Sequence, residues 1–291
     1  MPNLHALIRL ARPHQYVKNV FILMPLFFAG KITQADGLIL TVFGFFAFSL
    51  VASAVYIFND LFDVEEDRLH PEKQRRPLAA GEVNPKAAFL LSLAFALTGL
   101  VWMFILSIPA GGILLTYVVM NLGYSWRLKQ IPLVDVSIIA LGFALRLYVG
   151  SFVADIPLSQ WIVVTTFLLA LFLALAKRRD DVVMMTKTGT SVRPASEGYN
   201  LEMLNSAITL LGACCIVAYL QYTTSIEVTE RLGSDHVYAT TGFVVLGLLR
   251  YLQITFVYEK SGSPTQVILT DRFTQVNLLC WMISFGALIY L

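Results

Sequence analysis

The segment Asn59–Asp67 places a run of acids at the end of a strongly apolar stretch. On a helix, Asp60, Asp63 and Asp67 have the spacing i, i+3 and i+7 and share one face, with Asn59 at its edge. Carboxylates at the mouth of a membrane helix are costly unless they bind something cationic. A few carboxylates completed by substrate phosphates suit Mg²⁺. We therefore expect the three aspartates to be metal ligands and catalytic residues, and the ligand to be a Mg²⁺-bound diphosphate.

Basic residues follow these acids directly, in the loop 68–81. Lys73 and Arg76 are expected to hold phosphate oxygens, and arginine can do so with two parallel hydrogen bonds. The alternative is a loop whose positive charges only fix the topology of the chain. That alternative explains the bases but not the aspartates. His70 precedes a proline and is either structural or a substrate contact.

A second charged cluster, Lys177–Asp181, follows the sixth apolar segment. On a helix Lys177, Arg178 and Asp181 share a face, so these side chains could contact a substrate. Plain stop-transfer charges are the alternative. Further along, Tyr199 lies in a polar loop that could act as a lid or could simply connect two helices.

Other polar residues lie near or inside the apolar segments. Tyr124 and Lys129 close the fourth segment, where aromatic residues also fit the membrane interface and the lysine could touch a phosphate. Lys18 opens the first segment, as a snorkelling anchor or a phosphate ligand. Asp135 and Arg146 lie inside the fifth segment, where charge is costly and suggests function. They are too far apart for a direct pair, so each needs another partner, and bound substrate is one candidate.

Composition identifies the elements that must position these residues. Of the 291 residues, 57% are hydrophobic and only 14% are charged, and the mean hydropathy is +0.70. A soluble domain carries about 25% charge, so we predict an integral membrane protein. Nine apolar segments are long enough to cross a bilayer, and they make one all-α domain, residues 1–291. The expected spans are 17–33, 37–59, 86–107, 109–125, 132–153, 158–176, 202–223, 237–257 and 273–291.

The basic residues predict the orientation of these spans. Of the 21 lysines and arginines, only Lys31 and Arg231 fall on the side opposite the amino terminus, while Arg146 and Arg250 lie within spans. We therefore expect a multi-pass protein of the cytoplasmic membrane, with its amino terminus and active site on the cytoplasmic side. The three cysteines show no metal-binding spacing.

At these residues the chain resembles the UbiA superfamily of intramembrane prenyltransferases. Those enzymes carry the motif N-D-x-x-D-x-x-x-D followed by K-x-x-R-P-L-x-x-G, and both motifs are present here, at 59–67 and 73–81. The resemblance extends over essentially the whole chain and implies a UbiA-type helical bundle. The first motif is specific to the superfamily but does not fix the substrate.

Finer features are similar to one branch, the polyprenyl-phosphate (decaprenyl-phosphate) phosphoribosyltransferases. In that branch phosphoribosyl pyrophosphate enters from the cytoplasm with Mg²⁺, a lipid phosphate attacks its anomeric carbon, and pyrophosphate leaves. Ordinary prenyltransferases carry a second D-x-x-x-D motif after span six, where this chain has the bases of 177–179. These bases could replace a second metal ion. Asp180 and Asp181 make this site more acidic than in the branch. The features that carry the similarity are 12–19, 70–71, 124–132, 156–161, 176–178 and 249–251.

The resemblance implies a Mg²⁺-dependent pentosyltransferase that moves 5-phosphoribose onto a polyprenyl (decaprenyl-type) phosphate. The expected partners are phosphoribosyl pyrophosphate, polyprenyl phosphate and membrane lipid, without nucleic acid, and a homo-oligomer is compatible with them. The alternative is a UbiA-type prenyltransferase acting from a prenyl diphosphate on an aromatic or other acceptor. A transporter or flippase is a third hypothesis. The charged groups gather on one face of the membrane, which argues against a translocation path. The expected substrate-binding residues are Lys18, Asn59, His70, Lys73, Arg76, Tyr124, Lys129, Arg146, Lys177 and Arg178.

Overall fold

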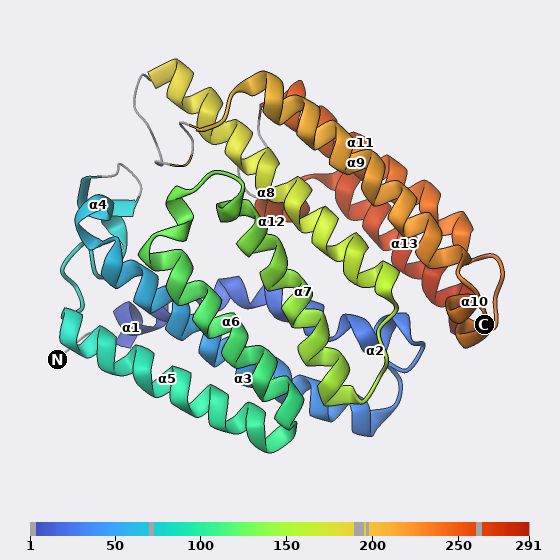
Figure 1. Cartoon of the computed structure of the whole chain (residues 1–291), viewed down its shortest axis with the longest axis horizontal. Coiled ribbons are helices and arrows are strands. Elements are labelled where there is room, and N and C mark those ends of the chain that lie inside the picture. The colour runs from blue at the N-terminus through green and yellow to red at the C-terminus, as the bar shows by residue number, and fades with distance from the viewer. Residues whose placement is uncertain (1–3, 70–72, 189–194, 196–197, 260–263, 291) are drawn as a thin grey trace. The chain divides into compact units, whose positions relative to one another are not determined.

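A computed structural model describes residues 4–69, 73–188, 195, 198–259 and 264–290 (Figure 1). The regular secondary structure within these ranges consists of α-helices and 3-10 helices, without a strand. This confirms the all-α prediction. His70 lies outside the described residues, so its expected substrate contact stays a prediction. In chain order the elements are α1 (Leu4–Ala11), η1 (Pro13–Ile22), α2 (Met24–Phe28), α3 (Ala35–Phe62), α4 (Val64–Leu69), η2 (Lys73–Arg75), α5 (Pro85–Leu106), α6 (Ile108–Trp126), η3 (Leu128–Gln130), α7 (Val134–Ala154), α8 (Gln160–Thr188), α9 (Leu201–Thr224), α10 (Ile226–Leu232), η5 (Val237–Thr240), α11 (Thr241–Phe256), α12 (Pro264–Thr270) and α13 (Arg272–Tyr290).

Eight helices in the described parts of the chain are long and apolar enough to cross a membrane. They match eight of the nine expected spans, so the multi-spanning prediction is confirmed and its count is close. The ninth expected span, 17–33, instead falls on η1 and the short helix α2. Pro13 begins η1 and Pro25 lies in the first turn of α2. Proline is favoured at helix starts and lacks the N–H group that a continuous helix needs, which is consistent with two short elements here.

The chain divides into two compact units. Unit 1 comprises residues 1–129 and 145–157, and unit 2 comprises residues 130–144 and 158–291. The boundary falls within α7, whose first part belongs to unit 2 and whose second part belongs to unit 1. The expectation that residues 1–291 form a single domain stays a prediction.

Unit 1 is built on α3, which packs against α5 and α6 (Figure 1). Its core contains Phe48, Val51, Met103 and Leu114, all fully buried. At Gly150 on α7 there is no room for a Cβ atom, because it would overlap the carbonyl group of Ile22 in η1. Close contact between α7 and η1 therefore depends on glycine at this position.

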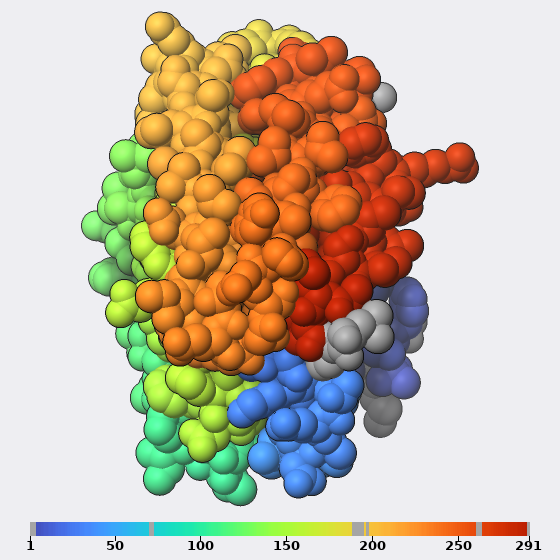
Figure 2. Space-filling model, turned by 90° about the vertical axis from the view of Figure 1, so that its right-hand side faces the viewer, coloured from blue at the N-terminus to red at the C-terminus, as the bar shows by residue number. Residues whose placement is uncertain are grey.

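Unit 2 is built on α8 and α9, which pack along each other, with α11 beside α9 and α13 beside α11 (Figure 1). Its core includes Phe172, Leu204 and Ile208. Figure 2 shows the orange and red surface that α9, α11 and α13 form. Large apolar side chains are exposed on these helices, among them Leu210 and Ile283. Such a surface suits contact with lipid, which is as apolar as the side chains themselves.

Candidate active site

The spacing of the acidic motif predicted one continuous helix, but the structure shows two helices with a break at Asp63. Helix α3 ends at Phe62, Asp63 is its C-cap residue with φ −91° and ψ 4°, and α4 begins at Val64. The N–H group of Asp67 still donates to the Asp63 carbonyl oxygen at 2.8 Å. Asp67 therefore stays close to the end of α3, although the helix is interrupted between the two segments.

Asp60 lies in the last turn of α3, and only 2% of its side chain is exposed. One nitrogen of Arg12, Nη2, donates to both carboxylate oxygens of Asp60, at 2.5 and 2.7 Å. Arg76 Nη1 donates to Asp60 Oδ1 at 3.0 Å. Two cations thus compensate one carboxylate that is almost completely removed from water.

Asp67 shares one of these cations. Arg76 Nη1 also donates to Asp67 Oδ2 at 2.6 Å, and Lys73 Nζ lies 4.0 Å from Asp67 Oδ1. A single nitrogen atom therefore stands between Asp60 and Asp67. The structure brings two of the three expected metal ligands around one point, together with both bases that were expected to hold phosphate.

Asp63 belongs to an adjoining set of contacts. Lys129 forms an ion pair with Asp63 Oδ1, and Asn59 Nδ2 donates to Asp63 Oδ2 at 2.9 Å. Asn59 Oδ1 accepts a hydrogen bond from Ser125 Oγ at 3.2 Å. Tyr124, the residue before Ser125, is half-buried near the end of α6. We call Asp60, Asp63 and Asp67 with their cations Arg12, Lys73, Arg76 and Lys129 the carboxylate cluster; it lies entirely within unit 1.

The carboxylate cluster fits Mg²⁺ in one specific way. Among the described residues, no group of three or more acidic, histidine or cysteine side chains converges closely enough to hold a metal ion by itself. Mg²⁺ commonly takes one or two protein carboxylates and completes its octahedral shell with water and substrate phosphates. Asp60 and Asp67 meet that requirement if Arg76 leaves the point between them. The donor set therefore suits a metal ion that arrives with phosphate.

Lys18 is half-buried in η1. Burial, together with the positive charges of Arg146 and Arg12, lowers the pKa of its ammonium group to about 8. An ammonium group with this pKa is poorly compensated by the protein around it, and an anionic ligand would stabilise its charge.

Arg146 on α7 is buried, and the protein supplies a partner for it. Its Nε donates to Asn19 Oδ1 at 2.9 Å, and its guanidinium carbon lies 4.8 Å from the ring centre of Phe48 and 5.1 Å from that of Tyr117. Asn19 in turn donates to Ser49 Oγ at 2.9 Å. These neutral groups give the buried guanidinium a hydrogen bond and two aromatic contacts. A substrate contact by Arg146 stays a prediction.

A second charged cluster lies in unit 2. Arg178 Nε donates to Asp135 Oδ2 at 2.5 Å, and Arg178 Nη1 donates to Asp181 Oδ2 at 3.0 Å. The hydroxyl of Tyr199 donates to Asp135 Oδ1 at 2.9 Å and accepts the N–H of Leu133 at 2.6 Å. Burial raises the pKa of Tyr199 to about 12, and the Asp135 carboxylate acts in the same direction. We call these residues the Asp135–Arg178 cluster.

This cluster answers the question that the sequence raised about Asp135, because Arg178 is its partner within the protein. It also assigns a contact to Tyr199, whose hydroxyl connects the loop before α9 to the start of α7. Lys177 precedes Arg178 on α8, and substrate contacts by these two residues stay predictions. Arg179 has a structural role, since it donates to Asn205 Oδ1 and to the Thr255 carbonyl oxygen, both at 2.8 Å.

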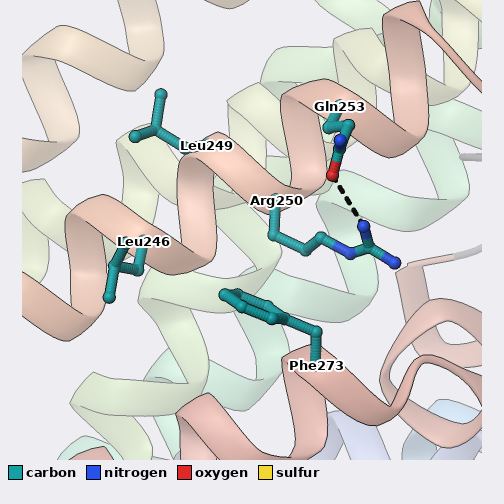
Figure 3. Close-up of a pocket in the computed structure, with 5 residues that line it drawn as sticks. All are labelled: Leu246, Leu249, Arg250, Gln253 and Phe273. Carbon is teal, nitrogen blue, oxygen red and sulfur yellow. Dashed lines mark hydrogen bonds between the residues drawn. The ribbon is translucent and has the colours of Figure 1, made fainter.

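Arg250 is likewise compensated within unit 2. It forms two hydrogen bonds with the Asp271 carboxylate, at 2.7 and 3.2 Å, and donates to Gln253 Oε1 at 2.6 Å. Figure 3 shows its side chain passing beside Phe273, in a pocket that Leu246 and others line. The hydrogen bonds with Arg250 are the main reason that the pKa of Asp271 lies far below its usual range.

Residues 19–262 match the model of the UbiA prenyltransferase family. The chain belongs to this family. It is therefore an enzyme of the UbiA prenyltransferase type, in agreement with the resemblance noted in the sequence.

Two relatives and one solved structure illustrate the similarity. The chain is 32% identical to the decaprenyl-phosphate phosphoribosyltransferase of Mycolicibacterium smegmatis, over 98% of this chain and 92% of that protein. It is 30% identical to the protein of that name from Corynebacterium glutamicum, over 98% of this chain and 87% of that protein. A UbiA homolog from Archaeoglobus fulgidus, solved with GPP and Mg²⁺, has a TM-score of 0.72 at 20% identity and covers 98% of this chain and 100% of its own. This last likeness concerns the fold.

The contact between Arg12 and Asp60 in the carboxylate cluster was not predicted from the sequence. This residue was noted only as part of an opening motif, yet it holds both oxygens of Asp60 from 48 positions away. Helical spacing cannot reveal such a pair. Its signal was the position of Arg12 beside Pro13, where the helical pattern breaks. Of the expected site residues, the structure brings together Asn59, Asp60, Asp63, Asp67, Lys73, Arg76 and Lys129.

Proposed function

We propose that this UbiA protein transfers 5-phosphoribose from phosphoribosyl pyrophosphate to a polyprenyl (decaprenyl-type) phosphate and releases pyrophosphate. The observation that carries the proposal is the convergence of Asp60 and Asp67 on one nitrogen of Arg76, with Lys73 beside them. Acids that suit a metal ion and bases that suit phosphate thus occupy one site. The similarity to decaprenyl-phosphate phosphoribosyltransferases over nearly the full length supports the choice of donor and acceptor.

In this proposal the residues of the carboxylate cluster exchange partners when the donor binds. Asp60 and Asp67 would hold Mg²⁺, and Asp63 would be its third protein ligand. When bound, Mg²⁺ neutralises charge on the departing pyrophosphate. Arg76 and Lys73 turn from the carboxylates to the phosphate oxygens, where they stabilise the charge that develops as the glycosidic bond to pyrophosphate breaks. No strong base is required, because the attacking lipid phosphate is already an anion.

We further propose that the protein resides in the cytoplasmic membrane, with its amino terminus and the carboxylate cluster on the cytoplasmic side. The uneven distribution of lysine and arginine between alternate loops supports this orientation. A soluble, highly charged donor then reaches the site from water, while the acceptor remains in lipid.

The competing function is prenyl transfer from a prenyl diphosphate, since a diphosphate site of this kind serves either donor. The test is mass spectrometry of the lipid formed by the purified protein with Mg²⁺. One reaction contains phosphoribosyl pyrophosphate and decaprenyl phosphate, and a second contains geranylgeranyl diphosphate with an aromatic acceptor. We expect a phosphoribosylated lipid in the first reaction and no prenylated product in the second. Product in the second reaction alone would contradict the proposal.

A further inference from the structure

Arg12 contacts both oxygens of Asp60, the carboxylate that we propose as a metal ligand. Its Nη2 atom donates to both oxygens of Asp60, while Arg76 uses only one of them. A divalent cation that binds Asp60 therefore competes with the positive charge of Arg12 at either oxygen. Asp67 differs in that Arg76 donates to only one of its oxygens, Oδ2, at 2.6 Å.

The backbone around Arg12 holds it in place. Arg12 has φ 54°, in the left-handed region that residues other than glycine rarely adopt. Directly before it, the carbonyl oxygen of Ala11 accepts a hydrogen bond from Ser53 Oγ at 2.7 Å. Tyr16 is hydrogen-bonded to the same Ser53 hydroxyl at 2.8 Å, and the ring of Tyr56 lies 5.5 Å from the guanidinium carbon. Strained backbone that is fixed from both sides often accompanies a functional side chain.

The two members of this ion pair differ in their access to water. The Asp60 side chain is 2% exposed, whereas that of Arg12 is 20% exposed. The guanidinium of Arg12 can therefore leave Asp60 and keep part of its hydration, while the buried Asp60 would keep only its single hydrogen bond from Arg76 and would gain from a replacement cation. Only a ligand that brings both a metal ion for Asp60 and negative charge for Arg12 satisfies both groups.

We propose that Arg12 is a resident counter-ion that prevents Asp60 from binding a metal ion alone and becomes a diphosphate ligand when metal and diphosphate arrive together. Binding of the two is then strongly coupled. This inference rests on the proposed diphosphate site but not on the identity of the group transferred, because phosphoribosyl and prenyl donors share the diphosphate.

The test measures Mn²⁺ binding to the full-length protein in detergent, by electron paramagnetic resonance, with and without inorganic pyrophosphate. For the wild type we expect weak binding of Mn²⁺ alone and binding at least about tenfold tighter with pyrophosphate. For Arg12→Gln we expect Mn²⁺ alone to bind about tenfold more tightly than to the wild type, because a charged hydrogen bond contributes roughly one to two powers of ten to an equilibrium constant. The gain from pyrophosphate should largely disappear.

Arg68→Gln is the matched control, since Arg68 pairs with the exposed Glu65 outside the carboxylate cluster, at 2.8 Å. It should bind Mn²⁺ as the wild type does. Thermal unfolding verifies that each variant folds, and Arg12→Lys, which keeps the charge but has one nitrogen, should give an intermediate result. Unchanged Mn²⁺ affinity in folded Arg12→Gln or Arg12→Lys would overturn the inference. Failure to transfer phosphoribose, with the expected Mn²⁺ behaviour, would instead remove only the proposed donor.

Discussion

The carboxylate cluster of unit 1 and the Asp135–Arg178 cluster of unit 2 pair the same kinds of side chain in different surroundings. In unit 1 the Asp60 carboxylate is buried but its cation Arg12 reaches water. In unit 2 both partners are sealed, with 2% of the Arg178 side chain and none of the Asp135 side chain exposed. Breaking a pair that is buried on both sides leaves an uncompensated charge, which is strongly unfavourable. An ion pair that is open on its cationic side can exchange partners, whereas a sealed pair fixes structure.

The largest expected effect tests the exchangeable pair. Asp60→Asn should lower phosphoribose transfer at least about a thousandfold, because the variant loses metal-binding charge where the leaving group develops charge. Product formation is measured by mass spectrometry of the lipid. Glu65→Gln, at an exposed acid in the same motif, is the control and should remain active. Near-normal turnover of Asp60→Asn would remove the metal assignment and with it one side of the comparison.

The sealed pair should respond in stability. Asp135→Asn leaves the buried Arg178 without its main counter-charge and should lower the free energy of unfolding by about 3 kcal/mol. Chemical unfolding in detergent measures this value. The double variant Asp135→Asn with Arg178→Met removes the stranded charge and should recover much of the loss. If Asp135→Asn is as stable as the wild type, the two clusters do not differ in the way that we infer.

The pH dependence of donor binding gives a smaller effect. Lys18 is cationic below its lowered pKa of about 8 and neutral above it. If Lys18 holds a donor phosphate, KM for the donor should rise by roughly tenfold between pH 7 and pH 9, as the positive charge is lost. Steady-state kinetics over this range provides the measurement. Lys18→Gln should have a high KM throughout and lack this pH dependence; a wild-type KM that is independent of pH would exclude the phosphate contact.

The smallest expected effect sharpens the role of Tyr199. Tyr199→Phe removes the hydroxyl that joins Asp135 to the N–H of Leu133, and should lower the free energy of unfolding by about 1 kcal/mol. The ion pair between Asp135 and Arg178 remains in this variant. We therefore expect kcat to change less than twofold, and a large fall in kcat would indicate that Tyr199 acts in catalysis rather than in support.

Much of the fold could be predicted from the sequence, because long apolar segments have few structural solutions in a membrane. The sequence also predicted that the acids of 59–67 and the bases of 73–76 form one site, because residues that are close in the chain stay close in space. The end of α3 at Phe62 was not visible, because the helical spacing of the acids continues past it. Pairs between distant segments were also hidden. Arg146 and Asn19, for example, are 127 positions apart, and no periodicity relates them.

The absence of a side chain at Gly150 has a consequence for a residue elsewhere in the sequence. Alanine at this position would press its methyl group against the backbone of Ile22 in η1, and the two segments would have to shift apart. Lys18 and Asn19 belong to that same short 3-10 helix. The smallest of all side-chain additions would therefore misplace the ammonium group of Lys18, which it never touches.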